Sequence, residues 1–472
     1  MCNMEKFNIV VQRIKELESR DFYTPETQRE VFSVLESLCG IVTDLFKENQ
    51  ELKDEVNRLK GEKGKPKLKP NKDASADTQK SKEKMESGSK KKKTKGSKND
   101  KIKIDRTETI ELDKTNLPDD IKFKGYEKKI VQNIIIKTDN VLYRLEKYYS
   151  PSLRKTYTAE IDDSLKNTEF GVETKALIST LYYENRVTEN KIASFLNANG
   201  LCISEGTISN ILIKEESKEL TRIKNEIFEA GLSSSIYQQI DDTGMRLSNK
   251  NAYATIVCNE KYSVFFINTS KSRETIKTFL PPSLSSMFTV LIGDDAPQFK
   301  KIAEKYGLCW IHEERHYTKL TPILEYHRKE LDRIRSEIWD YYKKLKDYKE
   351  SPTEQKKNEL WDGFDTIFKQ KTYYDELSKR LSLTFEKKNE LLTVLDYPEI
   401  PLHNNLSENG VREMVMKRKI SGGIKNEDGQ KAWENNMSIL ATCKKLGISF
   451  FDFMKGVFAK NTTVNLPELI LQ

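Results

Sequence analysis

Apolar residues between positions 31 and 59 recur at the spacing of a coiled coil. One seam position holds Val31, Leu38, Leu45, Leu52 and Leu59, and the other holds Leu35, Val42, Asn49 and Val56. Leucine at one position, with β-branched residues or asparagine at the other, favours a parallel two-stranded coiled coil whose register Asn49 fixes. An amphipathic helix packed on its own domain would give this pattern over two turns, but hardly over four. We therefore expect a homodimer through residues 31–60, preceded by an N-terminal helical segment over 1–30.

Two short segments with helical periodicity flank Gly200 within residues 187–214. Their apolar stripes consist of Ile192, Phe195 and Leu196 in the first segment and Ile208, Ile211 and Leu212 in the second. Ser204 is suited to cap the second helix. The exposed positions of that helix include Thr207, Ser209 and Asn210. The pattern fits a helix-turn-helix that contacts DNA, within a helical domain over 169–230, although any helical hairpin could share it.

Beyond residue 235 the apolar pattern becomes that of β-strands. Three segments rich in β-branched and aromatic residues are separated by polar turns: 235–242, 252–258 and 263–268. They predict an antiparallel meander. The following segments predict a helix over 272–280, a strand buried on both faces over 287–295, a helix over 296–306 and a short strand over 307–311. Residues 320–390 then read as almost wholly charged helix.

A lysine-rich segment separates the coiled coil from the rest of the chain. Residues 60–101 contain 16 Lys and six acidic residues, a net charge of +10 in a chain whose total is +8. This composition predicts a disordered basic linker over 61–104. Its charge attracts polyanions such as nucleic acid, although a solvating linker would look the same. Short β-rich segments then predict a small domain over 105–168, and they lie at 129–137, 141–149 and 152–160.

Cysteine usage and hydropathy indicate the compartment. The six cysteines are scattered, as in proteins of a reducing cytosol. No apolar run reaches the roughly 20 residues that cross a bilayer, and the start MCNMEKFNIV lacks the apolar block of a signal peptide. We expect a cytoplasmic protein without a membrane partner.

Two predicted strands end in pairs of aspartates, Asp241/Asp242 and Asp294/Asp295. A further acid, Glu408, lies in the first turn of a helix expected to be capped by Asn404 or Asn405. Carboxylates that converge above a sheet can bind Mg²⁺, and two such ions can activate a nucleophile and stabilise the leaving oxygen of a phosphodiester. An Asp-Asp pair after a strand is more often only a turn. Strand alternation cannot choose between adjacent aspartates, because either could face the site.

Five blocks follow one another in the second half of the chain: IDDTG (240–244), SKSRE (270–274), VLIGDDAPQF (290–299), GLCWIHEERHY (307–317) and PLHNNLSENGVREMVMKRKISGG (401–423). From about residue 170 to 457 the chain thereby resembles the DDE transposases of the insertion sequence 66 family. The resemblance implies the catalytic triad Asp241, Asp294 and Glu408. It also implies a ribonuclease H-like α/β catalytic domain, formed by residues 231–319 and 399–425.

The implied fold class is multidomain α+β. A helical insertion over 320–398 interrupts the catalytic domain, and a C-terminal helical segment covers 426–472. The resemblance implies DNA cleavage at transposon ends and strand transfer into target DNA, with two Mg²⁺ (or Mn²⁺) ions bound by the triad. The implied partners are DNA, a dimer or larger assembly on DNA, and small accessory proteins of the same element, in a bacterial cytoplasm at the nucleoid.

Further site residues follow from the matching blocks. We expect the catalytic site to be supported by Asp242, Asp295, His312, Asn404 and Asn405. DNA contacts are expected from Arg273, Arg315, Lys417, Arg418 and Lys419, besides the helix-turn-helix residues named above.

Several residues depart from the family pattern. His403 stands where the last block usually has Asp. Glu313 and Glu314 lie where basic residues are common, which would weaken any DNA contact there. Trp310 could stack on a flipped base, but core packing is the better interpretation.

Zinc is not expected. Cys309, His312 and His316 have the spacing C-x2-H-x3-H, but no fourth Cys or His lies near them in sequence. The small β-rich domain occupies the position of a zinc-binding module, yet no cysteine lies between Cys39 and Cys202.

Two other functions stay open. A catalytically inactive DNA-binding protein derived from a transposase would keep the coiled coil, the basic segment and the helix-turn-helix. A structural coiled-coil protein would leave the ordered blocks unexplained. The intact triad favours the transposase.

Overall fold

The computed structural model describes residues 12, 25–59, 102–112, 123–161, 166, 168–280 and 289–472. The chain divides into two compact units, one of Met1–Phe46 with Thr138–Gln472 and one of Lys47–Lys137. Most of the predicted segments over 1–30 and 61–104 lie outside the described residues. In the described part of the chain, no helix combines the length and the apolar character needed to cross a bilayer.

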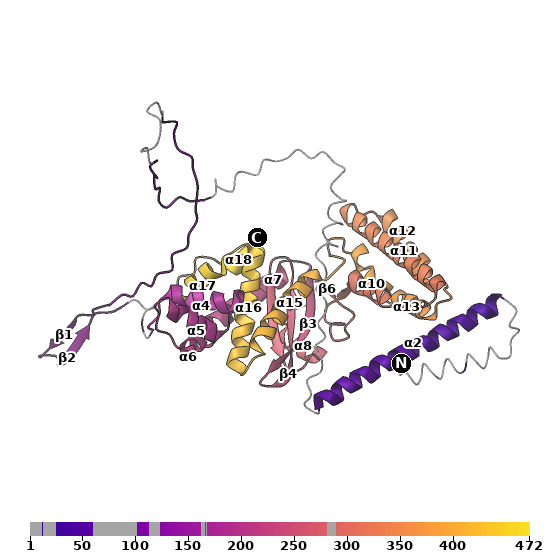
Figure 1. Cartoon of the computed structure of the whole chain (residues 1–472), viewed down its shortest axis with the longest axis horizontal. Coiled ribbons are helices and arrows are strands. Elements are labelled where there is room, and N and C mark those ends of the chain that lie inside the picture. The colour runs from indigo at the N-terminus through magenta and orange to yellow at the C-terminus, as the bar shows by residue number, and fades with distance from the viewer. Residues whose placement is uncertain are drawn as a thin grey trace. The chain divides into compact units, whose positions relative to one another are not determined.

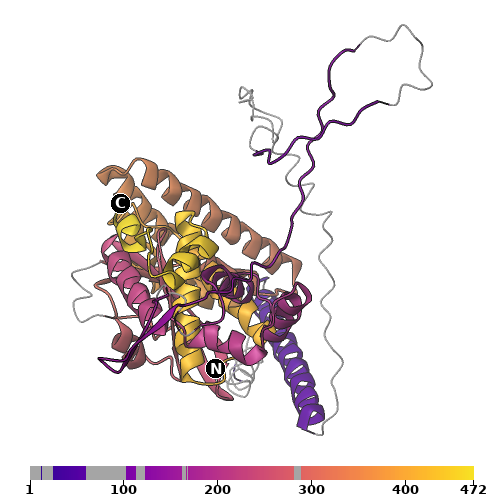
Figure 2. The same cartoon turned by 90° about the vertical axis from the view of Figure 1, so that its left-hand side faces the viewer.

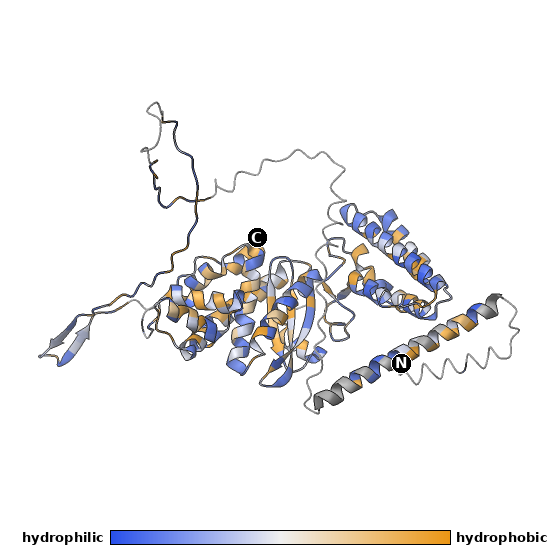
Figure 3. Cartoon of the chain, in the orientation of Figure 1, coloured by the Kyte–Doolittle hydropathy of each residue, from blue (hydrophilic) through white to orange (hydrophobic). Residues whose placement is uncertain are grey.

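Helix α2 (Pro25–Leu59) covers the segment predicted as a coiled coil (Figure 1). Hydrophobic and hydrophilic residues are mixed along it (Figure 3). Among the seam side chains whose burial the structure describes, four apolar ones are exposed: Leu35, Val42, Leu45 and Leu52. The helix is confirmed, and its pairing with a second copy stays a prediction.

Among the described residues of the predicted β-rich domain, the strands form one hairpin, in which β1 (Lys147–Ser150) pairs antiparallel with β2 (Lys155–Thr158). The β-rich segment expected over 129–137 is a wrong prediction, because these residues form neither helix nor strand. Ile134 is 90% exposed, and no described residue from 105 to 161 is buried. A β-prone sequence forms a strand where it has a surface to pack on, and none is present here among the described residues.

The helical domain begins with α4 (Val172–Ser179) and the π-helix η2 (Thr180–Glu184), followed by α5 (Glu189–Ala198), α6 (Glu205–Ile213) and α7 (Ser217–Ser233). Helices α5 and α6 are the predicted pair. Gly200 between them has φ +93°, which L-residues rarely adopt. Ser204 accepts a hydrogen bond from the backbone N–H of Thr207, so the predicted cap is confirmed. The predicted stripes are buried except for Phe195, which is 40% exposed.

A mixed sheet has the strand order β5-β4-β3-β6-β7. Its strands are β3 (Tyr237–Leu247), β4 (Lys250–Cys258), β5 (Ser263–Asn268), β6 (Val290–Gly293) and β7 (Lys305–Leu308). The first three form the predicted antiparallel meander, while β6 runs parallel to both β3 and β7. On β6, Val290 and Ile292 pack in one apolar core and Leu291 in another, which confirms a strand buried on both faces.

The helix predicted over 272–280 is α8 (Arg273–Phe279), but the helix predicted over 296–306 is wrong. Residues 297–304 form turns and bends, with Lys301 at φ +61°. The apolar spacing there reflects core contacts made from an irregular connection, since Phe299 is buried. The strand predicted over 307–311 ends early, because Trp310 already begins the next helix.

The remaining elements are helices: α10 (Trp310–Thr318), α11 (Glu325–Glu350), α12 (Glu354–Phe368), α13 (Asp375–Phe385), α14 (Lys388–Leu391), the 3-10 helix η3 (Thr393–Leu395), α15 (Asn405–Ser421), α16 (Glu427–Leu446), α17 (Phe450–Phe458) and α18 (Leu466–Leu471). Helices α11–α14 occupy the region predicted to be charged helix. The C-terminal helices lie against the α4–α6 group (Figures 1 and 2).

Helix α16 covers the free edge of the sheet at β5. Three edge N–H groups donate to side chains of this helix: those of Ser263, Phe265 and Ile267, to Thr442, Ser438 and Glu434 respectively. The acceptors recur every four residues, so they share one helix face. Covering an edge in this way prevents another strand from adding to it.

Candidate active site

Asp241 lies on β3, and Asp294 directly follows β6, the parallel strand beside it. The register of β3 and β6 pairs Gln239 with Ile292, and each aspartate comes two residues later. Because side chains two residues apart lie on the same face of a strand, the two aspartates continue the paired positions. The sheet therefore brings together two of the three predicted catalytic acids.

The acids of this region act on one another electrostatically. Burial raises the pKa of Asp241 to about 7, and the negative charges of Asp294, Asp242 and Glu408 act in the same direction. A carboxyl group close to other carboxylates resists ionisation. All three predicted catalytic residues thus belong to one acidic cluster.

Gln239 fixes the helix that carries Glu408. Its side-chain amide donates to the backbone oxygen of His403, and its Oε1 accepts from the N–H groups of Leu406 and Ser407 at 3.1 and 3.3 Å. Gln239 is fully buried. Gln239 was not predicted as a site residue, because nothing in the sequence places its strand beside the start of α15.

Helix α15 approaches the sheet closely at Gly410. A Cβ atom there would lie 2.2 Å from Cδ1 of Ile256. Ile256 is the residue of β4 that pairs with Asp241. The missing side chain thus allows the first turn of α15, with Glu408, to lie against the strands beside Asp241.

The second aspartate of each pair has other partners. Asp242 accepts a hydrogen bond from Gln298 at 2.8 Å. Asp295 forms ion pairs with Lys300 and Lys387 at 2.7 and 2.5 Å. Burial alone would raise the pKa of Asp295, but hydrogen bonds from the two lysines hold it below its usual value. The charge of Asp295 is therefore balanced inside the protein.

The segment that contains Trp310 ties the parts of the site together. The N–H of Cys309 donates to Gly293, directly before Asp294, and the N–H of Trp310 donates to Leu402, shortly before α15. The indole of Trp310 is buried and donates to the backbone of Leu391. The expected core role of Trp310 is confirmed.

His312 and Arg315 lie beside Glu408. The Nε2 atom of His312 is 3.4 Å from Oε1 of Glu408, and Nη1 of Arg315 is 3.4 Å from the same oxygen. Arg315 also donates to His312 Nε2 at 3.0 Å. Its side chain is 48% exposed, so it can reach a ligand outside the protein.

Glu313 and Glu314 point into the protein, so the expectation that they weaken a DNA contact is wrong. Glu313 pairs with Arg380 and with Lys387, and Glu314 pairs with Arg335 at 2.8 Å. Both acids are buried. They attach α10 to α11 and α13.

Lys417 is buried, so the prediction that it contacts DNA is wrong. It is 1% exposed, and its Nζ donates to the backbone oxygen of Tyr182 at 2.5 Å. The helical pattern gave no sign that aromatic residues from distant segments enclose this position. Arg418 is partly exposed and Lys419 is exposed, so both stay candidates for DNA contact.

The side-chain cap expected from Asn404 or Asn405 is also wrong. Asn404 is fully buried, and neither of its side-chain polar atoms has a partner. Its backbone oxygen accepts from Glu408, while Gln239 caps the helix instead. Asn405 is exposed at the helix start.

The other predicted DNA contacts differ in exposure. Arg273 is partly exposed and donates to the backbone of Pro297 at 2.6 Å. On α6, Thr207 and Ser209 are partly exposed and Asn210 is exposed. No described contact links them to the acidic cluster.

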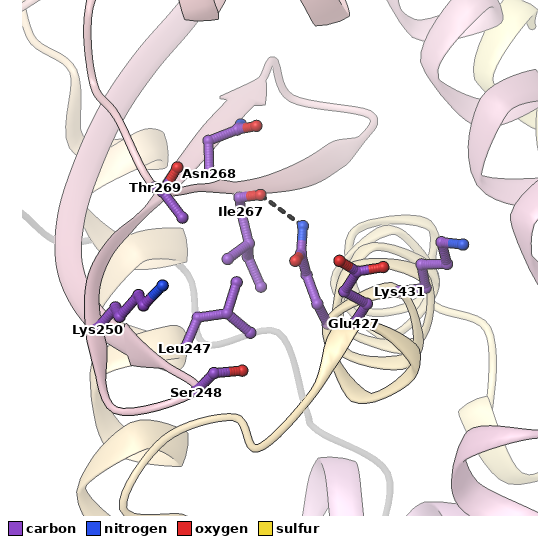
Figure 4. A pocket seen from close by; sticks show the side chains of 9 residues that line it. Leu247, Ser248, Lys250, Ile267, Asn268, Thr269, Glu427 and Lys431 are labelled. Atoms are coloured by element: carbon purple, nitrogen blue, oxygen red, sulfur yellow. Dashed lines mark hydrogen bonds between the residues drawn. The ribbon is translucent and has the colours of Figure 1, made fainter.

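A hollow of about 450 Å³ lies where the β3–β4 turn and the end of β5 meet the start of α16 (Figure 4). Its lining includes Lys250, Thr269 and Glu427, and Gln430 donates to the backbone of Ile267 across it. None of the predicted catalytic residues lines it.

Comparison with known proteins gives two matches. The family model described as "Transposase IS66 family" matches residues 167–432. A relative from Sinorhizobium fredii (strain NBRC 101917 / NGR234), named "Uncharacterized protein y4jO", is 39% identical over 166 residues. That match covers 35% of this chain and 51% of the relative, so the chain spans about half the length of the curated relative.

Proposed function

The chain belongs to the IS66 family of transposases, and from that premise we propose that it cleaves DNA at transposon ends and transfers the cut strands into target DNA. The observation that supports this most is the electrostatic coupling of Asp241 to Asp294 and Glu408. These residues come from a strand, a strand end and a helix, and they are the three acids that the family resemblance implies.

The acidic cluster fits divalent cations. The raised pKa of Asp241 reflects burial among other carboxylates, an arrangement that a cation would stabilise. Carboxylate oxygens suit Mg²⁺ and Mn²⁺. Two such ions, held by Asp241, Asp294 and Glu408, would supply activation of the attacking oxygen and stabilisation of charge at the phosphodiester.

The protein's own residues hold and orient the reacting groups in this proposal. Gln239 keeps Glu408 at a fixed place, because it bonds both sides of the turn that begins α15. Arg315 lies next to Glu408 and is exposed, so it is suited to pair with a phosphate oxygen. Arg418 and Lys419 would position DNA without reading its sequence.

The fold supports the same proposal. Three antiparallel strands followed by two parallel ones are compatible with a ribonuclease H-like domain that α11–α14 interrupt. The exposed apolar seam of α2 supports dimerisation through residues 31–60. We propose a larger assembly on DNA, with accessory proteins of the same element as further partners.

A strand-transfer assay tests the function. Purified full-length protein is incubated with labelled DNA from both flanks of its gene and with Mg²⁺ or Mn²⁺. We expect cuts at the repeats and joined products in the wild type, and neither in Asp241→Asn, Asp294→Asn or Glu408→Gln. Asp428→Asn, an exposed acid in the first turn of α16, is the matched control and should react normally.

The same assay separates the alternative function. DNA that is bound but left uncut by the wild type and by all variants would favour the catalytically inactive DNA-binding protein. Addition of the neighbouring gene products then distinguishes an inactive site from a missing accessory protein.

A further inference from the structure

Cys309, His312 and Glu408 form a mixed group of potential metal ligands. Each offers one sulfur, nitrogen or oxygen atom, and these atoms lie within 4.8 Å of one another. Cys309 and His312 are three residues apart at the start of α10, so they face the same side. Glu408 comes from the first turn of α15. The spacing C-x2-H lacked a further ligand nearby in sequence, and the fold supplies one from a distant segment.

Nε2 of His312 lies 3.4 Å from Oε1 of Glu408. This is close to the distance between two ligand atoms of one tetrahedral ion. Two ligands that are each about 2.0–2.1 Å from a tetrahedral zinc ion lie roughly 3.3 Å apart. Arg315 lies 3.0 Å from the same Nε2 and is 48% exposed, so its guanidinium can move away when a metal ion takes its place there.

The sulfur makes the group different from the acidic cluster. Cys309 is buried, and its sulfur lies near the backbone N–H groups of His312 and Asn404. A metal ion that prefers sulfur displaces the thiol proton on binding. Thiolate and imidazole together select zinc-like cations over Mg²⁺. The side chains of His312 and Glu408 are 29% and 18% exposed, which leaves a path to solvent.

Buried polar atoms without partners gather at this place. They include Nδ1 of His312 and both side-chain polar atoms of Asn404, whose residue is fully buried. Such atoms are uncommon in folded proteins and often mark a bound ion or water. The backbone N–H of Asn404 acts on the Cys309 sulfur, so these atoms belong to residues of the same small region.

We propose that Cys309, His312 and Glu408 bind one thiophilic divalent cation, of which Zn²⁺ is the natural example, with water as the fourth ligand. Glu408 is the one residue that this site shares with the acidic cluster. Occupation by zinc therefore withdraws Glu408 from Asp241 and Asp294 and inhibits strand transfer. The inhibition, unlike the binding, rests on the proposed function.

Cobalt binding tests the site without DNA. Full-length protein is titrated with Co²⁺, and absorption is followed for the charge-transfer band of a sulfur–cobalt bond. We expect a band that saturates at one equivalent and disappears when Zn²⁺ is added. Cys309→Ser should abolish it, and His312→Asn should weaken binding by at least the roughly tenfold that loss of a residue supporting a metal ligand costs. Cys202→Ser, which changes an exposed cysteine in the connection between α5 and α6, should keep the band.

The wild-type titration tests the metal site even if a variant folds poorly. A wild type without a sulfur band, or a band that survives in Cys309→Ser, would overturn the proposal. Asp241→Asn should keep the band, and its loss there would assign the cobalt to the acidic cluster instead.

Strand transfer measured in Mg²⁺, with and without micromolar Zn²⁺, tests the inhibition. The ratio of the two rates should fall at least about tenfold in the wild type and stay near one in Cys309→Ser. A wild type that binds cobalt through sulfur but resists zinc would overturn the inhibition. A wild type that is inactive even without zinc counts against the proposed function alone, because the absorption experiment decides the metal site.

Discussion

The ammonium group of Lys417 lies 3.1 Å from the centre of the Tyr182 ring and donates to the backbone oxygen of the same residue. Tyr182 belongs to the π-helix η2, which directly precedes α5, whereas Lys417 belongs to the helix that carries Glu408. A second link between these elements is the ion pair of Arg186 with Glu413. The helical domain is thus attached to the helix of the candidate active site by a buried lysine.

The burial of Lys417 predicts a pH dependence of stability. Burial lowers the pKa of Lys417 from 10.5 to about 7. Between these values the unfolded chain holds a proton that the folded protein lacks, so the free energy of unfolding rises with pH, by at most about 1.4 kcal/mol per unit. Lys417→Met should remove this slope, whereas Lys419→Met on the exposed side of α15 should keep it. Urea unfolding from pH 7 to 10 measures both, and equal slopes in both variants would contradict the assignment.

Gln239 should matter for activity beyond its effect on stability. Gln239→Leu leaves two N–H groups and one carbonyl of the α15 start without partners, each at a cost of about 1–3 kcal/mol. Because Glu408 is then no longer held, we expect strand transfer per folded molecule to fall strongly while DNA binding persists. Gln238→Leu is the matched control: this neighbouring glutamine is also buried, but it bonds to Gly231, Leu232 and Tyr262.

Comparing Gln239→Leu with Gln238→Leu separates the effect on the position of Glu408 from the effect on the stability of the fold. Both should lower the melting temperature, and only Gln239→Leu should lower the rate of the folded fraction. An equal loss of rate in the two would mean that Gln239 acts only through stability.

Gly410 tests how closely α15 must lie on the sheet. Gly410→Ala places a methyl group against Cδ1 of buried Ile256 and should move Glu408 away from Asp241. A displacement of about 1 Å can cost about 10²-fold in rate. Ile256→Val removes the opposing methyl group, so the double variant should recover most of the rate. If the double variant is as slow as Gly410→Ala, the contact with Ile256 is not the cause.

Local pattern was sufficient for part of this structure. Alternating and β-branched residues predicted β3, β4 and β5, and the cap at Ser204 was predicted from one residue type before an apolar stripe. Patterns failed where distant segments decide. The sequence predicts a surface lysine at Lys417, but Tyr182 from a distant segment covers it. It predicts β-structure at Ile134, but this side chain is exposed and has no surface to pack on among the described residues. The role of Gln239 depends on its hydrogen bonds to the start of α15, a contact between distant segments that local pattern does not predict.

Strand alternation does not show whether Asp294 or Asp295 is the catalytic acid, and only the family resemblance favours Asp294. Asp295 is balanced by Lys300 and Lys387, whereas Asp294 acts on the pKa of Asp241. Asp294→Asn should therefore lower the rate of strand transfer by about 10²-fold or more, as loss of a group that stabilises a transition state does. Asp295→Asn should lower the melting temperature through its unpaired lysines and reduce the rate far less. Rates from single-turnover assays at saturating Mg²⁺ measure the difference, and a larger loss in Asp295→Asn would reverse the assignment.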